Sequence, residues 1–202
     1  MRAQTALAFL LLLTSTAIAD DRSLLGKWES LTRGDGNIGS TLQLNADGSL
    51  ARTLGAMVDS TYTFDGKRLR ITSADPDSGK PVTATYAVKV AGDSLLQKNG
   101  GGRGVDIEMR RLTPFQLARP IVGTWRYPHP SGTTAFVTFT EDGKQLVRIP
   151  LRVDGGSWVA EGNHLTLNVD GTDPVTSEYR LERNMLTLVE GGKEFRYRRV
   201  KY

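Results

Sequence analysis

The heptapeptide IVGTWRY, residues 121–127, decides the fold because its Gly-x-Trp centre repeats that of LLGKWES, residues 24–30, almost a hundred residues earlier. Further matches follow in the same order. LQLNADGSL at 42–50 corresponds to VTFTEDGKQL at 137–146, and YTFDGKRLRI at 62–71 corresponds to WVAEGNHLTL at 158–167. Conserved order with small drifts in spacing indicates two copies of one fold that differ in loop length. The joint between the copies is predicted at TPFQLARP, residues 113–120.

Each copy consists of short runs in which apolar and polar residues alternate, the period of half-buried strands. Leu42-Gln43-Leu44 is one such run, and turn dipeptides such as Asp142-Gly143 separate the runs. Eight strands are predicted in the second copy, at residues 124–127, 135–140, 145–151, 157–161, 164–169, 177–182, 185–189 and 194–201. Short connections favour an antiparallel up-and-down meander, and closure into a barrel removes its two unpaired edges.

The predicted fold class is therefore all-β, with two tandem eight-stranded antiparallel barrels. The first copy spans residues 20–112, a linker spans 113–120, and the second copy spans 121–202. Short helical turns are expected before each Gly-x-Trp, at residues 23–25 and 113–117. One alternative stays open, in which the copies share strands in one larger barrel. It would show as pairing between strands on either side of residues 113–120.

Residues 1–19 have the three parts of a secretory signal peptide. Arg2 precedes an apolar run at 6–13, and Ala17-Ile18-Ala19 forms a cleavage site before Asp20. This pattern predicts a secreted or periplasmic protein. The chain has no cysteine, which excludes a disulfide framework, a metal-thiolate site and a thiol-linked lipid anchor. No later segment reaches the length of about 20 apolar residues that a membrane-spanning helix needs.

The charged residues, 26 Lys and Arg against 22 Asp and Glu, are scattered along the chain. Only RYRRVKY, residues 196–202, is densely basic, so no nucleic-acid interface is predicted. His129 and His164 lack the spacing of metal ligands, and no G-x-S-x-G motif occurs. We therefore expect no metal, no cofactor and no catalytic residues. The RGD tripeptide at 33–35 is attributed to chance, and NGGGRG at 99–104 to a hairpin tip.

A Gly-x-Trp at the first strand, answered by an arginine on the last strand of an eight-stranded meander, resembles the small lipocalin-like (calycin) β-barrel domains of secreted bacterial proteins. In that family the tryptophan packs at the closed end of the barrel, and the arginine lies across its ring. The resemblance implies that Arg110 or Arg111 lies over Trp28. Alternation favours Arg111, because it shares a strand face with Met109.

The same reasoning for the second copy leaves Arg198 or Arg199 over Trp125, and alternation favours Arg199, which shares a face with Tyr197. We expect both pairs, Trp28 with Arg111 and Trp125 with Arg199, to have a structural role. Each would close one barrel and tie its first strand to its last.

The functional expectation is a non-catalytic binding or interaction module that takes a small apolar or amphipathic ligand at the open end of a barrel. The candidate ligand-binding residues are the inward aromatics and two arginines suited to an anionic head group: Tyr62, Tyr86, Trp158, Tyr179, Arg52 and Arg148. Core packing is the competing interpretation of the aromatics, because eight short strands leave little interior space. A protein–protein inhibitor or envelope-assembly factor with filled barrels is the alternative function. A hydrolase or isomerase built on scattered carboxylates ranks below both.

Overall fold

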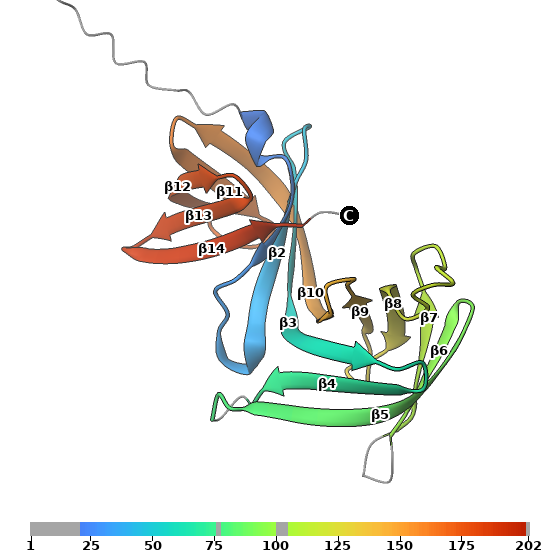
Figure 1. Cartoon of the computed structure of the whole chain (residues 1–202). Helices are drawn as coiled ribbons and strands as arrows, with labels where there is room; N and C mark the ends of the chain where they lie inside the picture. Colours follow the sequence, from blue (N-terminus) through green and yellow to red (C-terminus); the bar gives the residue numbers. More distant parts are fainter. Residues whose placement is uncertain (1–20, 76–77, 100–104, 201–202) are drawn as a thin grey trace, which may run out of the picture.

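The computed structural model describes residues 21–75, 78–99 and 105–200, and most of them lie in β-strands (Figure 1). The expected signal peptide and residues 100–104 of the NGGGRG segment lie outside the described residues. The strands of the described part are β1 (Gly26–Ser30), β2 (Ile38–Leu44), β3 (Ser49–Phe64), β4 (Arg68–Ala74), β5 (Pro81–Ala91), β6 (Ser94–Lys98), β7 (Ile107–Arg111), β8 (Gly123–Pro128), β9 (Thr134–Phe139), β10 (Lys144–Glu161), β11 (His164–Val169), β12 (Val175–Glu182), β13 (Met185–Glu190) and β14 (Lys193–Arg199). Two short 3-10 helices, η1 (Asp21–Leu24) and η2 (Asp35–Asn37), flank β1. The all-β prediction is confirmed.

Every strand pairs antiparallel with its neighbours along the chain, and β1 pairs with β14, so the sheet closes on itself. Strand β7 pairs with β8 through Arg110 with Arg126 and Arg111 with Trp125. This pairing crosses residues 113–120, which is the sign expected if the two copies share one sheet. The joint in the sequence is therefore not a boundary in the sheet.

Strands β3 and β10 also pair with each other, from Lys144 opposite Thr61 to Ser157 opposite Ser49. Strand β2 pairs with residues 50–56 of β3, whereas β4 pairs with residues 61–64. Likewise β9 pairs with residues 145–148 of β10, and β11 with residues 156–161. The β3–β10 ribbon thus divides the closed sheet into two smaller rings.

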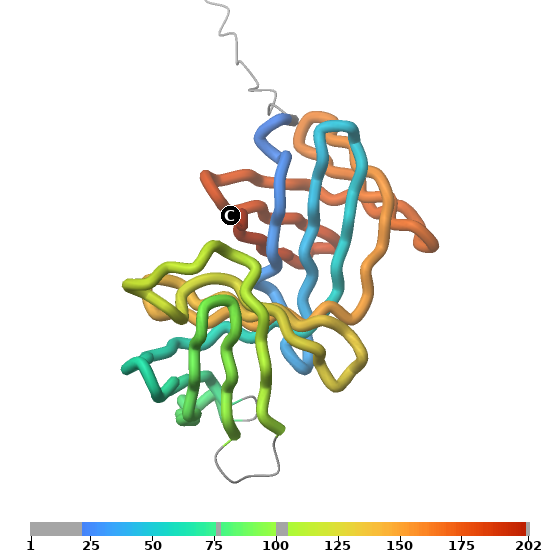
Figure 2. The backbone as a smooth tube through the Cα atoms, turned by 90° about the vertical axis from the view of Figure 1, so that its right-hand side faces the viewer, coloured from blue at the N-terminus to red at the C-terminus, as the bar shows by residue number. Residues whose placement is uncertain are grey.

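The first ring contains β1, β2, the first half of β3, the second half of β10, and β11 to β14. The second ring contains β4 to β9 with the remaining halves of β3 and β10. Figure 2 shows this exchange, with the red and orange strands of the second copy sharing one ring with the blue strands of the first. The prediction of one barrel within 20–112 and another within 121–202 is corrected, because each ring takes strands from both copies.

The exchange occurs because β10 does not turn back on itself. The predicted strands at 145–151 and 157–161 are one continuous strand that carries the chain from one ring into the other. The β3–β10 register shifts between Pro150 and Arg152, as in a β-bulge. A bulge bends a strand without ending it. Strand β3 runs through both rings in the same way, so the exchange is reciprocal.

Gly55 lies at the crossing, opposite Gly39 on β2 and Pro150 on β10. A Cβ atom at Gly55 would collide with the backbone carbonyl oxygen of Ile149. We expect Gly55→Ala to lower the free energy of unfolding by about 1–3 kcal/mol, because overpacking forces the backbone to shift. Urea denaturation followed by circular dichroism measures this change. Gly34→Ala is the matched control, since its Cβ would have its nearest neighbour at 3.9 Å. Equal losses in the two variants would contradict the close crossing.

Each ring encloses its own apolar core, and both cores draw on both copies. The first core includes Trp28 and Leu42 from the first copy with Leu165 and Leu186 from the second. The second core also combines residues of the first copy with residues of the second: Leu69, Val88, Leu95, Met109, Ile121, Trp125, Val137 and Phe139. Closing either ring therefore requires both halves of the chain.

Trp28 and Trp125, the tryptophans of the two Gly-x-Trp motifs, are fully buried. Each lies under an arginine, but the arginine is not the one that was predicted. The guanidinium of Arg199 lies 4.1 Å from the ring centre of Trp28, and that of Arg111 lies 4.0 Å from the ring centre of Trp125. The expected pairs, Trp28 with Arg111 and Trp125 with Arg199, are wrong. The physical reason is the strand exchange, which places β1 beside β14 and β8 beside β7.

The glycine of each Gly-x-Trp makes this closure possible. Gly26 and Gly123 have φ values of 116° and 128°, a region that side chains rarely adopt. A Cβ atom would also come within 3.1 Å of Arg199 Nη1 at Gly26, and within 3.0 Å of Arg111 Nη1 at Gly123.

Helix η1 precedes the first Gly-x-Trp motif, where a short helical turn was expected. Residues 113–117 do not form the second expected helical turn. A turn over residues 116–119 lies there instead, in which Arg119 N donates to the carbonyl of Gln116.

Candidate functional site

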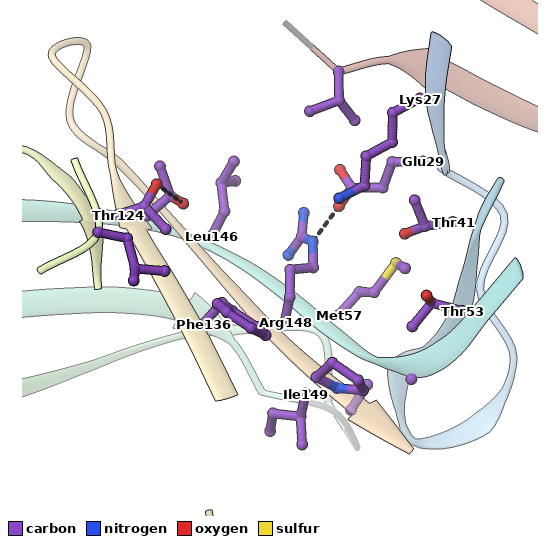
Figure 3. A pocket seen from close by; sticks show the side chains of 16 residues that line it. Lys27, Glu29, Thr41, Thr53, Met57, Thr124, Phe136, Leu146, Arg148 and Ile149 are labelled. Carbon is purple, nitrogen blue, oxygen red and sulfur yellow. Dashed lines mark hydrogen bonds and ion pairs between the residues drawn. The ribbon is translucent and has the colours of Figure 1, made fainter. Parts of the chain in front are cut away.

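A cleft of about 420 Å³ lies between the outer faces of the two rings (Figure 3). Its floor is the β3–β10 ribbon, with Met57, Arg148 and Pro150. Strands β1 and β2 form one wall, and β8 and β9 contribute the other. Glu29 and Thr124 line these walls because each follows or precedes a buried tryptophan, and successive side chains of a strand point to opposite faces.

Corresponding positions of the two copies face the cleft. Lys27 and Thr124 directly precede the two tryptophans. Thr41 and Phe136 occupy a second matched pair of positions, just before Leu42 and Val137 in the sequence. The residues differ, so the walls differ. In Figure 3, Lys27, Glu29 and Thr41 lie on one side of the cleft, and Thr124, Leu146 and Phe136 lie on the other. The cleft is therefore amphipathic.

Three arginines and two carboxylates form one hydrogen-bonded cluster beside the cleft, here called the arginine–carboxylate network. Glu29 accepts hydrogen bonds from Arg148 Nε and from Arg198 Nη2, the latter at 2.8 Å. Asp59 accepts hydrogen bonds from Arg33 Nη2 at 2.8 Å, Arg148 Nη2 at 2.7 Å and Arg198 Nη2 at 3.2 Å. The network joins β1, β3, β10 and β14, and its formal charge is positive by one.

Both carboxylates of the network are ionised at neutral pH. Burial by itself raises the pKa of Glu29, but hydrogen bonds and charges from Arg148 and Arg198 outweigh it, so the pKa lies below the ordinary 4.5. The pKa of Asp59 is lowered in the same way, with Arg148 and Arg33 opposing the effect of burial. For Arg148, burial lowers the pKa and the bond to Glu29 raises it, with a net increase. The network thus stabilises its charged form.

Backbone carbonyls hold the network arginines in place. Arg148 Nη1 donates to the carbonyls of Val58, at 3.2 Å, and Val147, at 2.8 Å. Arg33 Nη1 donates to the carbonyl of Met57 at 2.6 Å. Arg33 is the arginine of the RGD tripeptide, and its side chain is only 16% exposed. The tripeptide therefore does not present its arginine to solvent.

Of the six predicted ligand-binding residues, only Arg148 lines the cleft. The aromatics pack against the cores: Tyr62 and Tyr86 against the second, Trp158 and Tyr179 with the first. Tyr62 also donates its hydroxyl to the carbonyl of Thr140 at 2.9 Å, and Trp158 Nε1 donates to that of Asn45 at 3.0 Å. The core-packing interpretation of these aromatics is confirmed.

Arg52 does not join Arg148, although the two occupy matched positions in the copies. It forms an ion pair with Asp154 on β10, at 3.0 Å. The sequence also did not single out Glu29, Asp59 or Phe136, because outward strand positions look like solvent-facing ones. The consecutive arginines at the end of each last strand were a usable signal. One of each pair covers a tryptophan, and in the second copy the other, Arg198, reaches Glu29.

Searches against protein-family models, curated proteins and solved structures found no match for this chain. Within the part of the chain that the structure describes, no helix is long and apolar enough to cross a membrane. The same residues contain no group of three or more His, Asp or Glu side chains placed to hold a metal ion. The cleft is therefore interpreted from its own geometry.

Proposed function

We propose that the protein is a non-catalytic binding module that holds a small amphipathic molecule in the cleft between its rings. The observation that carries this proposal is the cleft itself. Its volume of about 420 Å³ falls within the range of about 300–1,000 Å³ that is usual for ligand sites. The signal-peptide pattern of residues 1–19 supports a secreted or periplasmic location.

In this proposal the two rings are lipocalin-like barrels with filled interiors, and the ligand binds outside them. The support is that each glycine, tryptophan and arginine of the closing motif is present, and that the candidate aromatics belong to the cores. Met57, Phe136 and Leu146 offer apolar surface in the cleft, and Arg148 is already held by the network. A site whose polar group is fixed in advance loses little entropy on binding.

The proposal predicts that the apolar fluorophore N-phenylnaphthylamine binds in the cleft and that Phe136→Ala weakens its binding about tenfold, or about 1.4 kcal/mol, through loss of apolar contact. Fluorescence titration measures the affinity. Val159→Ala is the matched control, because Val159 lies on β10, is 48% exposed and does not line the cleft. No binding to the unmodified protein, or equal effects of both substitutions, would count against the site. Native mass spectrometry of the protein from its own compartment would identify the class of any retained molecule.

A protein partner is the second candidate, favoured by one exposed apolar segment. Leu112, Phe115 and Leu117 follow β7 and are 48%, 42% and 85% exposed, and of these Leu112 also lines the cleft. Large exposed apolar side chains grouped on one segment are typical of interaction sites. Replacement of Phe115 and Leu117 by serine, with retention of a protein partner in affinity purification as the readout, separates this candidate from the ligand site.

A further inference from the structure

We infer that the ligand is an anion, with its head group at Lys27 and Arg148 and its apolar part against Phe136 and Leu146. This inference rests on the proposed function, because it names the chemical class that the cleft would take. The inferred binding site also differs from the one expected from the sequence, which was the open end of a barrel and not a cleft between the two rings.

The charge around the cleft is the first argument. Among the described residues that line it, three are charged, namely Lys27, Arg148 and Glu29. Arg33, Arg198 and Asp59 are linked to these through the network. The six groups carry a net excess of two positive charges. A cleft with one sign of excess charge between low-dielectric walls concentrates ligands of the opposite sign.

Glu29 and Arg148, the two network residues that line the cleft, differ in how readily they can bind a charged head group. Both carboxylate oxygens of Glu29 accept hydrogen bonds from arginines, and its side chain is only 9% exposed. A cationic head group would therefore have to displace Arg148 or Arg198. An anion can bind Arg148 without displacing its described partners, because arginine has five N–H donors. The bonds between Arg148 and its described partners use four of them and leave one on Nη2.

The arrangement of the walls gives the ligand a direction. Lys27 projects into the cleft from the same side as Glu29, whereas Phe136 and Leu146 lie opposite (Figure 3). At the position that matches Lys27, the second copy has the uncharged Thr124. The head group would therefore lie toward β1, and the apolar part toward β9 and the first half of β10.

Three amphiphiles with the same chain, decanoate, decanol and decyltrimethylammonium, test the inference by displacing N-phenylnaphthylamine from the full-length protein. We expect decanoate to displace the probe at the lowest concentration. Lys27→Met should weaken decanoate binding about tenfold and leave decanol binding unchanged, because only the charge contact is lost. Lys67→Met is the matched control: it removes the same charge from an exposed turn between β3 and β4.

Equal displacement by decanol and decanoate, or strongest displacement by decyltrimethylammonium, would overturn the anionic head group while the binding cleft itself stands. An equal loss of decanoate affinity in Lys67→Met would also overturn it, since the effect would then come from overall charge. A probe that fails to bind the unmodified protein is a different outcome and refutes the proposed function.

Discussion

Trp125→Ala is expected to lower the free energy of unfolding by about 3–5 kcal/mol, the usual loss when a buried tryptophan is truncated. Trp125 has no exposed surface and belongs to the second core, so its removal leaves a cavity under Arg111. Its Nε1 also donates to the carbonyl of Ile121 at 2.9 Å, and that acceptor would lose its partner. Urea denaturation at constant pH measures the loss. A change below about 1 kcal/mol would contradict the structural role of Trp125.

A double-mutant cycle extends this prediction to the strand exchange. We expect Trp125→Ala to couple with Arg111→Met by about 0.5–2 kcal/mol, the energy of a cation–π contact, and to add independently with Arg199→Met. The two arginine variants are matched controls for each other, because both remove an arginine that covers a tryptophan. Tandem barrels that close within one copy predict the reverse result. Coupling of Trp125 to Arg199 would therefore contradict the exchange.

Glu29→Gln is expected to destabilise the protein by about 3–5 kcal/mol, because it removes one of the two carboxylates that compensate the charges of Arg148 and Arg198. Water reaches these arginines, whose side chains are 18% and 34% exposed, so the lower end of the range is expected. Glu194→Gln is the control. Glu194 pairs with Arg196 at 2.8 Å on an exposed surface, and such pairs contribute about 0–1 kcal/mol. Similar losses in both variants would show that burial of the network has no energetic consequence.

The pH dependence of stability gives the same prediction a second readout. The folded pKa of Glu29 lies below its ordinary 4.5. The contribution of ionised Glu29 to stability is therefore complete above its ordinary pKa of 4.5 and is lost as the pH falls through the folded pKa. Between about pH 5 and pH 3, the melting temperature of the unmodified protein should fall more steeply than that of Glu29→Gln. Asp59 is also shifted downward but is present in both proteins, so it does not account for the difference. Equal slopes would contradict the ionised Glu29 pair.

Much of the fold was predictable because its signals are local. Alternating residues and turn dipeptides located most strands, and His164–Val169 was predicted with the bounds that the structure has. The break expected between residues 151 and 157 was wrong, since the Gly-Gly at 155–156 lies within a continuous strand. The candidate site was less predictable. Arg148 was identified, but its partner Glu29 lies far away in the sequence, and no local pattern relates the two.

The sequence by itself predicted that the chain is all-β and that it consists of two copies, and the resemblance to lipocalin-like domains implied that Trp28, Trp125, Arg111 and Arg199 close the sheet. These features depend on strand period and on motifs within single strands. Only the tertiary structure decided which arginine covers which tryptophan. Each copy presents an equivalent first strand and last strand, so closure within a copy and closure between copies make nearly the same contacts. The choice depends on whether β3 and β10 turn back or continue, and their continuation also creates the cleft, because it places the outer faces of the two rings against each other.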